Sequence, residues 1–307
     1  MKTLNENIKN VKQFIEESEQ KALQGSFAYE LQALSLANHL QELEQKELFQ
    51  QISAKSEVLD FRLMAESMKT GAISLAMLSK ISDCINRMLG HIADRIIRGQ
   101  KAASRVPEAI SNILNLQLCG LLPGSTRLLI SANADRDLFE DGLAKNTILR
   151  IFNLLDTYGE GESFLESIMD FGAYGVRNLR NFLQIINSVS GSLELNWEHN
   201  GCAERSWKGT SSQITQLSSA LDSMIIKEAI EETADGVIEL LSKNERIHLR
   251  KENGELIKIY FSNTHLQDVE QLHLNQKVSL VCKSSETENP HTNEVYQYYE
   301  LIEILET

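Results

Sequence analysis

Proline, cysteine and aromatic residues are scarce in this chain: its 307 residues include 3 prolines, 4 cysteines and 6% aromatic residues. With 42% hydrophobic and 24% charged residues, the composition is that of an ordinary folded protein, large enough for two domains or one domain with a small module. The cysteines lie far apart and form no CxxC pair, as is typical of a protein in the reducing cytosol. They are Cys84, Cys119, Cys202 and Cys282.

Positive charge and long apolar runs are also lacking. Lys and Arg total 30 against 43 Asp and Glu, a formal net charge of -13, which disfavours a polybasic coat that wraps nucleic acid. No stretch approaches the roughly 18 apolar residues of a membrane span, and the first ten residues have no apolar core typical of a secretory signal. The sequence therefore predicts a cytoplasmic protein that does not associate with membranes.

Common catalytic motifs are missing as well. The sequence has no GxSxG, GxGxxG, GxxxxGK[ST] or HExxH pattern, and its seven histidines do not cluster with cysteines at metal-binding spacing. We therefore predict no cofactor, no metal site and no catalytic residue. Missing motifs do not exclude catalysis, but the chain carries no positive sign of an enzyme.

Apolar periodicity predicts an α+β protein that begins with a helical hairpin over residues 1–54. Leu4, Ile8, Val11 and Ile15 recur at helical spacing. After a break at residues 25–26 a second helical pattern follows, with its apolar residues at Leu31, Leu34, Ala37 and Leu40. This stripe has to be buried, either on the rest of the chain or against a partner or a second copy.

The next segment, residues 55–200, is expected to fold as a ferredoxin-like β-α-β-β-α-β layer. Strands are predicted near residues 58–66, 114–118, 127–132 and 193–197, with helices over 74–98 and over 137–188, the latter interrupted near 158–161. A turn at 122–125 joins the second and third strands. Residues 201–235 are expected to link this layer to the C-terminal segment, with a loop over 199–212 and a helix over 213–232.

Residues 236–307 predict a small β-barrel of the OB type, with an SH3-like barrel as the alternative. Five short strands are expected near 237–241, 246–250, 256–261, 277–282 and 295–304, with a short helix after the third. Asn253-Gly254 is a strong hairpin signal because both residues tolerate positive φ.

Two basic stripes are candidate sites for nucleic acid or other anions. On the second and third barrel strands, alternation points Ile247, Leu249, Ile257, Ile259 and Phe261 inward. The outer face then combines cations with an exposed aromatic, as in single-strand binding barrels: Arg246, His248, Arg250, Lys258 and Tyr260. The 7 Lys and Arg against 12 Asp and Glu in residues 236–307 weaken this hypothesis.

The second stripe runs along the helix predicted at 74–98. Arg87, His91, Arg95 and Arg98 share one helix face and could hold phosphates or an acidic segment. A solvated face whose cations pair with nearby carboxylates is the alternative.

An acidic segment follows the strand at 127–132. Asp135, Asp137, Glu140 and Asp141 could supply oxygen ligands to a metal. Capping of the following helix explains them equally directly, and we favour it.

Several short stretches, together with the terminal barrel, resemble uncharacterised bacterial proteins from genomic-island or phage-defence neighbourhoods. The stretches are Leu122-Pro-Gly-Ser, Asp137-Leu-Phe and Leu193-Glu-Leu-Asn-Trp. The resemblance covers residues 55–307 and implies a bacterial accessory protein, without implying a reaction or a site residue.

Three functional hypotheses follow. The first is a non-enzymatic interaction or regulatory protein, an adaptor or accessory subunit that binds a protein partner or a second copy through its hairpin. The second is a nucleic-acid-binding protein that uses the outer barrel stripe. The third is a divergent metal-dependent nuclease or hydrolase that uses the segment at 135–141.

Overall fold

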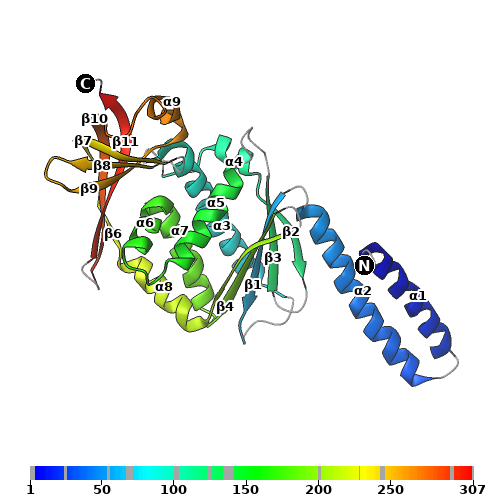
Figure 1. Ribbon diagram of the computed structural model, residues 1–307. Coiled ribbons are helices and arrows are strands. Elements are labelled where there is room, and N and C mark those ends of the chain that lie inside the picture. Colours follow the sequence, from blue (N-terminus) through cyan, green and yellow to red (C-terminus); the bar gives the residue numbers. More distant parts are fainter. Residues whose placement is uncertain are drawn as a thin grey trace.

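The computed structural model describes residues 4–23, 26–53, 56–66, 72–99, 104–122, 126–133, 142–199, 202–227, 229–242, 246–290 and 294–305. Within them the chain combines a helical hairpin, a five-stranded sheet, a layer of helices and a second sheet that closes as a barrel (Figure 1). The predicted α+β class is confirmed.

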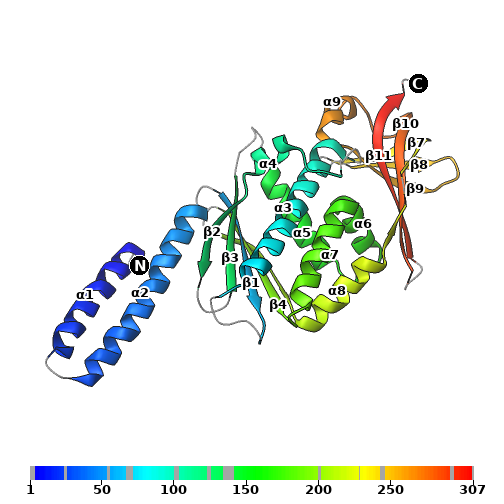
Figure 2. The same cartoon turned by 180° about the vertical axis from the view of Figure 1, so that it is seen from behind.

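Helices α1 (Leu4–Ala22) and α2 (Phe27–Ser53) form the predicted hairpin. Ile8 and Leu43 are buried, and Lys12 Nζ lies 2.7 Å from Glu44 Oε1 across the two helices. Both views show the hairpin extending away from the rest of the chain, which it meets at the C-terminal end of α2 (Figures 1 and 2). The predicted stripe of α1 therefore packs on α2 and not on the body of the protein, with Ile8 buried and Leu4, Val11 and Ile15 half-buried.

The first sheet contains β1 (Ser56–Met64), β2 (Gln117–Leu122), β3 (Thr126–Asn133), β4 (Ser192–His199) and β5 (Cys202–Gly209). Its strand order is β2-β3-β1-β4-β5, and all neighbouring strands are antiparallel. Three of the four predicted strands are found near their predicted positions.

Two predictions for this sheet are wrong. Residues 114–118 do not form one strand, because α4 (Glu108–Leu114) ends there, Asn115 turns with φ 41°, and β2 begins at Gln117. The expected loop over 199–212 is largely β5. This edge strand is mostly exposed and polar, so only Trp207 gives the apolar signal that sequence periodicity detects.

Helices form a layer between this sheet and the barrel (Figures 1 and 2). They are α3 (Leu75–Arg98), α5 (Leu143–Asp156), α6 (Glu162–Phe171), α7 (Ala173–Asn187) and α8 (Ser211–Ser223). The helix predicted over 74–98 is confirmed, and Ser74 Oγ accepts a hydrogen bond from the amide of Met77 at 3.2 Å.

The long helical stretch predicted over 137–188 is divided twice. The expected break near residues 158–161 is present, and a second break at Gly172, with φ +78°, separates α6 from α7. Helices and sheet share one apolar core, in which Phe61 of β1 packs edge-on against Phe182 of α7 with ring centroids 5.7 Å apart. The expected turn residues 123–125 and the acidic residues 135–141 lie outside the described part of the chain.

The second sheet contains the short β6 (Ile225–Ile226), then β7 (Ile230–Ser242), β8 (Arg246–Lys251), β9 (Leu256–Tyr260), β10 (Lys277–Asn289) and β11 (Glu294–Leu305). Its order is β11-β9-β8-β7-β10-β6, and pairing of β11 with β10 closes a five-stranded barrel. The β9–β11 pair is parallel. A 3-10 turn (Asn263–His265) and α9 (Leu266–Val269) follow β9.

All five predicted barrel strands are present, and Gly254 adopts φ +86° in the predicted β8–β9 turn. The helix predicted over 213–232 is wrong in its second half. Helix α8 ends at Ser223, because the Ile225–Ile226 segment pairs with β10 and residues from Ile230 onward belong to β7. β7 thus begins earlier than the predicted barrel boundary at Gly236.

Candidate functional site

The β8–β9 hairpin has the predicted inward and outward faces. Ile247, Leu249, Ile257, Ile259 and Phe261 are buried in the barrel core, as alternation predicted. One end of the outer face, however, lies against α6, which contacts Arg246, Lys258 and Tyr260. Arg250 and Leu256 at the other end are exposed. Sequence alternation identifies which side chains share a face, but not what covers that face.

The predicted exposed aromatic is buried in this contact. Tyr260 is 7% exposed, and its hydroxyl donates a hydrogen bond to Glu166 of α6. Its ring stacks on Tyr298 of β11 with centroids 4.5 Å apart and an interplanar angle of 9°. Tyr260 therefore joins the barrel to α6, and its prediction as an exposed base-stacking residue is wrong.

The cations of the same stripe are paired with carboxylates. Arg246 Nη2 lies 2.9 Å from Glu166 Oε1, and Lys258 Nζ lies 3.4 Å from Glu162 Oε1. Farther out, Arg250 donates two hydrogen bonds to Glu239, from Nε to Oε1 and from Nη2 to Oε2, the latter at 2.9 Å. These hydrogen bonds lower the pKa of the Glu239 carboxyl. His248 is half-buried on the same face. The stripe is therefore neutralised within the chain.

The four residues of the predicted α3 stripe have separate environments. Arg87 is exposed and pairs with Asp83 at 2.9 Å, and the Arg98 Nε group donates to Asp94 Oδ1 at 2.5 Å. His91 is buried and stacks on Tyr174, with ring centroids 5.1 Å apart, and burial lowers the pKa of its imidazole. The continuous phosphate-binding face is not present, since its two central residues point into the protein.

Arg95 is the residue of this stripe that reaches the barrel. It is 9% exposed, and its Nε group donates to the Met169 carbonyl at 3.1 Å. Its guanidinium lies over the Tyr298 ring at 5.3 Å, with Nη1 at 3.8 Å from Glu300 Oε2. Gly172 allows this position, because a Cβ there would lie 2.8 Å from Arg95 Cδ.

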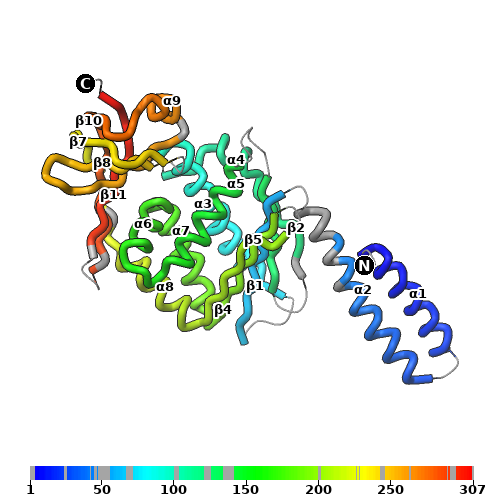
Figure 3. Tube along the Cα trace, in the orientation of Figure 1, coloured from blue at the N-terminus to red at the C-terminus, as the bar shows by residue number. Residues whose placement is uncertain are grey.

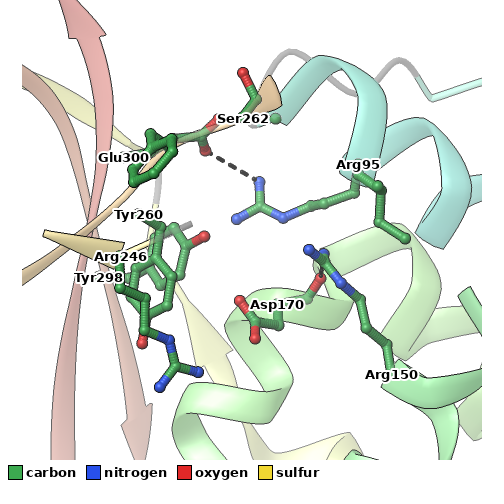
Figure 4. A pocket seen from close by; sticks show the side chains of 11 residues that line it. Arg95, Arg150, Asp170, Arg246, Tyr260, Ser262, Tyr298 and Glu300 are labelled. Carbon is green, nitrogen blue, oxygen red and sulfur yellow. Dashed lines mark hydrogen bonds and ion pairs between the residues drawn. The ribbon is translucent and has the colours of Figure 1, made fainter. Parts of the chain in front are cut away.

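A cavity of about 70 Å³ opens between α3, α5, α6 and the barrel beside this guanidinium (Figure 4). We call it the Arg95 cavity; its charged and aromatic walls include Arg95, Arg150, Asp170, Arg246, Tyr298 and Glu300. The structure thus brings together Arg95 from one predicted stripe with Arg246 and Tyr260 from the other.

Asp170 is one of two acidic groups in this cavity, with Glu300. Burial raises the pKa of the Asp170 carboxyl, and Arg150, Arg95 and Arg246 oppose that shift. A second cavity of about 160 Å³ lies on the other side of Arg95, between α3, the start of α7 and the segment before β7. Its walls include His91, Tyr174 and Lys227, and Lys227 also pairs with Glu286.

Sequence reasoning missed Arg150, Asp170, Tyr298 and Glu300. Arg150 and Asp170 each lie on predicted helix, and Glu300 and Tyr298 lie on a predicted strand, but no motif links them. The available signal was the presence of charged residues within apolar helical patterns, which indicates burial but not a shared site.

The hairpin carries a different kind of surface. One side of α2 faces α1 and is half-buried. Its residues recur at helical spacing and are Tyr29, Leu36, Leu40 and Leu43. Phe27, Leu31 and Leu34 lie on the opposite side and are 70%, 52% and 62% exposed. We call these three residues the hairpin stripe. Phe14 of α1 is also exposed.

Metal ligation has no support in the described part of the chain, where no three His, Cys, Asp or Glu residues are grouped to hold an ion. The acidic segment at 135–141 falls outside those residues. None of the described helices is both long and apolar enough to cross a membrane.

Comparisons with models of known protein families, with curated proteins and with solved structures find no match to this chain.

Proposed function

We propose that this chain is a non-enzymatic interaction protein, an adaptor or accessory subunit that binds a protein partner through its N-terminal hairpin. The observation that carries the proposal is the hairpin stripe. Phe27, Leu31 and Leu34 are apolar, adjacent on one helix face and exposed, on an element that extends away from the body (Figure 1). Contiguous exposed apolar surface of this kind is typical of an interaction site.

The charge of the hairpin favours a partner of a different sequence over a second copy. Residues 4–53 contain eight glutamates and four lysines, within a chain of net charge -13. Two such hairpins would bring like charges together, whereas a partner helix with basic residues beside its apolar face would gain attraction. The partner chemistry we propose is an amphipathic, basic helix.

The contacts of the barrel stripe give less support to nucleic-acid binding. Tyr260 is buried, and the paired Arg246 and Lys258 would have to leave their carboxylates to reach a phosphate. We therefore place nucleic-acid binding below protein binding, and propose no metal-dependent activity.

We propose in addition that the two sheets are variants of the predicted units. The order β2-β3-β1-β4 supports a ferredoxin-like arrangement to which β5 is added at one edge. For the barrel, five strands with a helix between the third and fourth support the OB type over the SH3-like type. A cytoplasmic bacterial setting, with a role in phage defence, belongs to the same proposal and derives from the sequence resemblance.

The test is affinity purification of the tagged full chain from its own host, compared with a variant carrying Phe27→Ser, Leu31→Ser and Leu34→Ser. Full burial of one such side chain contributes about 1.5–3 kcal/mol. The affinity of the variant for its partner should therefore fall by more than about 100-fold, and the stoichiometric partner should no longer be recovered. The matched control is Leu75→Ser, which removes an exposed leucine at the start of α3. Equal recovery of the partner by all three proteins would contradict the proposal.

A further inference from the structure

Three arginines from separate elements border the Arg95 cavity: Arg95 from α3, Arg150 from α5 and Arg246 from β8. Asp170 and Glu300 are the carboxylates in its wall, and Glu166 of α6 also pairs with Arg246, so arginines and carboxylates are equal in number around the cavity. A water-sized site needs about 10–15 Å³. A cavity of about 70 Å³ therefore accommodates a group of a few heavy atoms and not a large organic ligand.

Two of the guanidinium groups are held in place by main-chain oxygens at the end of α6. Arg95 Nε donates to the Met169 carbonyl at 3.1 Å, and Arg150 Nη1 donates to the Asp170 carbonyl at 2.6 Å. A guanidinium has five N–H donors, so these bonds fix the side chains and leave further donors on each. Fixed donors bind an oxyanion with little loss of side-chain entropy.

The Asp170 carboxylate lies beside the Arg95 and Arg150 guanidinium groups on the α6 side of the cavity (Figure 4). It makes no side-chain hydrogen bond and no ion pair within 4.0 Å to any residue that the structure describes. Arg150, Arg95 and Arg246 favour the ionised form of this carboxylate, against the burial that raises its pKa, and an ionised carboxylate only accepts hydrogen bonds. An oxyanion that enters this cavity therefore meets arginine donors and the Asp170 carboxylate as an acceptor, while the other carboxylate of the wall, Glu300, is paired with Arg95.

We propose that the Arg95 cavity binds a phosphate-sized oxyanion that carries a proton, such as hydrogen phosphate. Its unprotonated oxygens accept hydrogen bonds from Arg95 and Arg150, and its P–OH group donates to the Asp170 carboxylate. Sulfate has the same shape but no proton at neutral pH, so its oxygen would face the carboxylate as a second acceptor. The cavity should therefore select phosphate over sulfate.

The test is calorimetric titration of the full chain with inorganic phosphate and with sulfate at matched ionic strength and about pH 8, where phosphate keeps one proton. Phosphate should bind with a dissociation constant near or below about 1 mM, and sulfate at least about tenfold more weakly. Arg150→Gln should weaken phosphate binding by about tenfold or more, since charge-assisted hydrogen bonds are lost. Arg87→Gln, which changes an exposed arginine on α3, should leave binding unchanged.

Asp170→Asn keeps the shape of the side chain and adds an N–H donor, so it separates the proposal from a general loss of folding. This variant should bind sulfate and phosphate with similar affinity. Three outcomes would overturn the proposal: no phosphate binding by the folded wild-type chain, equal affinity of the wild type for both anions, or an unchanged phosphate preference in Asp170→Asn.

Discussion

Tyr260 is one centre of the contact between the barrel and α6. Its hydroxyl donates to Glu166 and lies 3.2 Å from the Tyr296 hydroxyl, and its ring lies between Tyr298 and the Arg246 guanidinium. Burial is the main cause that raises the pKa of the Tyr260 hydroxyl far above its ordinary value, and the neighbouring Tyr296 and Glu166 add to the shift. The folded chain therefore keeps this tyrosine neutral in alkaline solution.

Stability should depend on pH through this residue. Between the unfolded pKa near 10 and the higher folded pKa, the folded state holds the proton and the unfolded state does not, so the free energy of unfolding falls as pH rises. The stabilisation that the raised pKa of Tyr260 provides is fully present below about pH 10. Urea unfolding of the wild type should show a steeper fall from about pH 9.5 to 11 than Tyr260→Phe. The variant should also lose about 1 kcal/mol at neutral pH.

Tyr174→Phe is the control for this prediction. Tyr174 is partly exposed, and its hydroxyl makes no hydrogen bond within the residues that the structure describes. If both phenylalanine variants had the same alkaline dependence, the buried Tyr260 group would not be its source.

Gly172 and Gly159 form a matched pair for a second prediction. Both have positive φ, +78° and +94°, so alanine should cost each about 1 kcal/mol of conformational strain. At Gly172 the new Cβ would also lie 2.8 Å from Arg95 Cδ, whereas at Gly159 nothing lies within 4 Å. Urea unfolding should therefore show Gly172→Ala to be less stable than Gly159→Ala by roughly a further 1–3 kcal/mol. Equal losses would show that the packing of Arg95 does not depend on this glycine.

At the scale of single helices and strands, the sequence predicted what depends on local pattern. The α3 helix, the barrel strands and the turn at Asn253-Gly254 follow from apolar periodicity and turn chemistry. The sequence did not reveal β5, because a polar strand at a sheet edge has the composition of a loop. The end of α8 was also missed, since the Ile225–Ile226 segment is extended through its pairing with β10, a contact distant in the sequence.

The start of α8 offers a test of local stabilisation. Thr210 and Gln213 form a capping box. Thr210 Oγ1 accepts a hydrogen bond from the backbone N–H of Gln213, and Gln213 Oε1 accepts one from the backbone N–H of Thr210 at 2.9 Å. Thr210→Ala should lower the free energy of unfolding by about 1 kcal/mol, measured by urea unfolding. Thr210→Ser keeps the hydroxyl and should stay close to the wild type; an equal loss in both would argue against the cap.

At the scale of the whole molecule, the hairpin and the barrel lie at opposite ends of the layered body (Figure 3). Whether the residues of a predicted site are exposed or buried depends on this arrangement more than on any sequence motif. The two basic stripes lie on one helix and on one strand hairpin as expected, but Arg95 of the first stripe meets Arg246 and Tyr260 of the second at the Arg95 cavity. Periodicity cannot show which faces come together, because that depends on how the sheet, helices and barrel pack.

Removal of residues 1–54 should leave the remaining chain folded. The hairpin is stabilised mainly by contacts between α1 and α2, and it meets the body at the end of α2. The truncated chain should therefore keep its thermal midpoint to within a few degrees while losing the partner. A large fall in the midpoint would show that the hairpin is part of the core.

Site-specific photo-crosslinking tests the interaction proposal most directly. A photoreactive amino acid replaces Phe27 in the full chain, and a control protein carries it at Leu75, which is also exposed. Crosslinking in the native host should join position 27, and not position 75, to an amphipathic helix with basic residues in a different protein. Crosslinks from position 27 only to a second copy of this chain, or crosslinking equal to that at position 75, would contradict the proposed function.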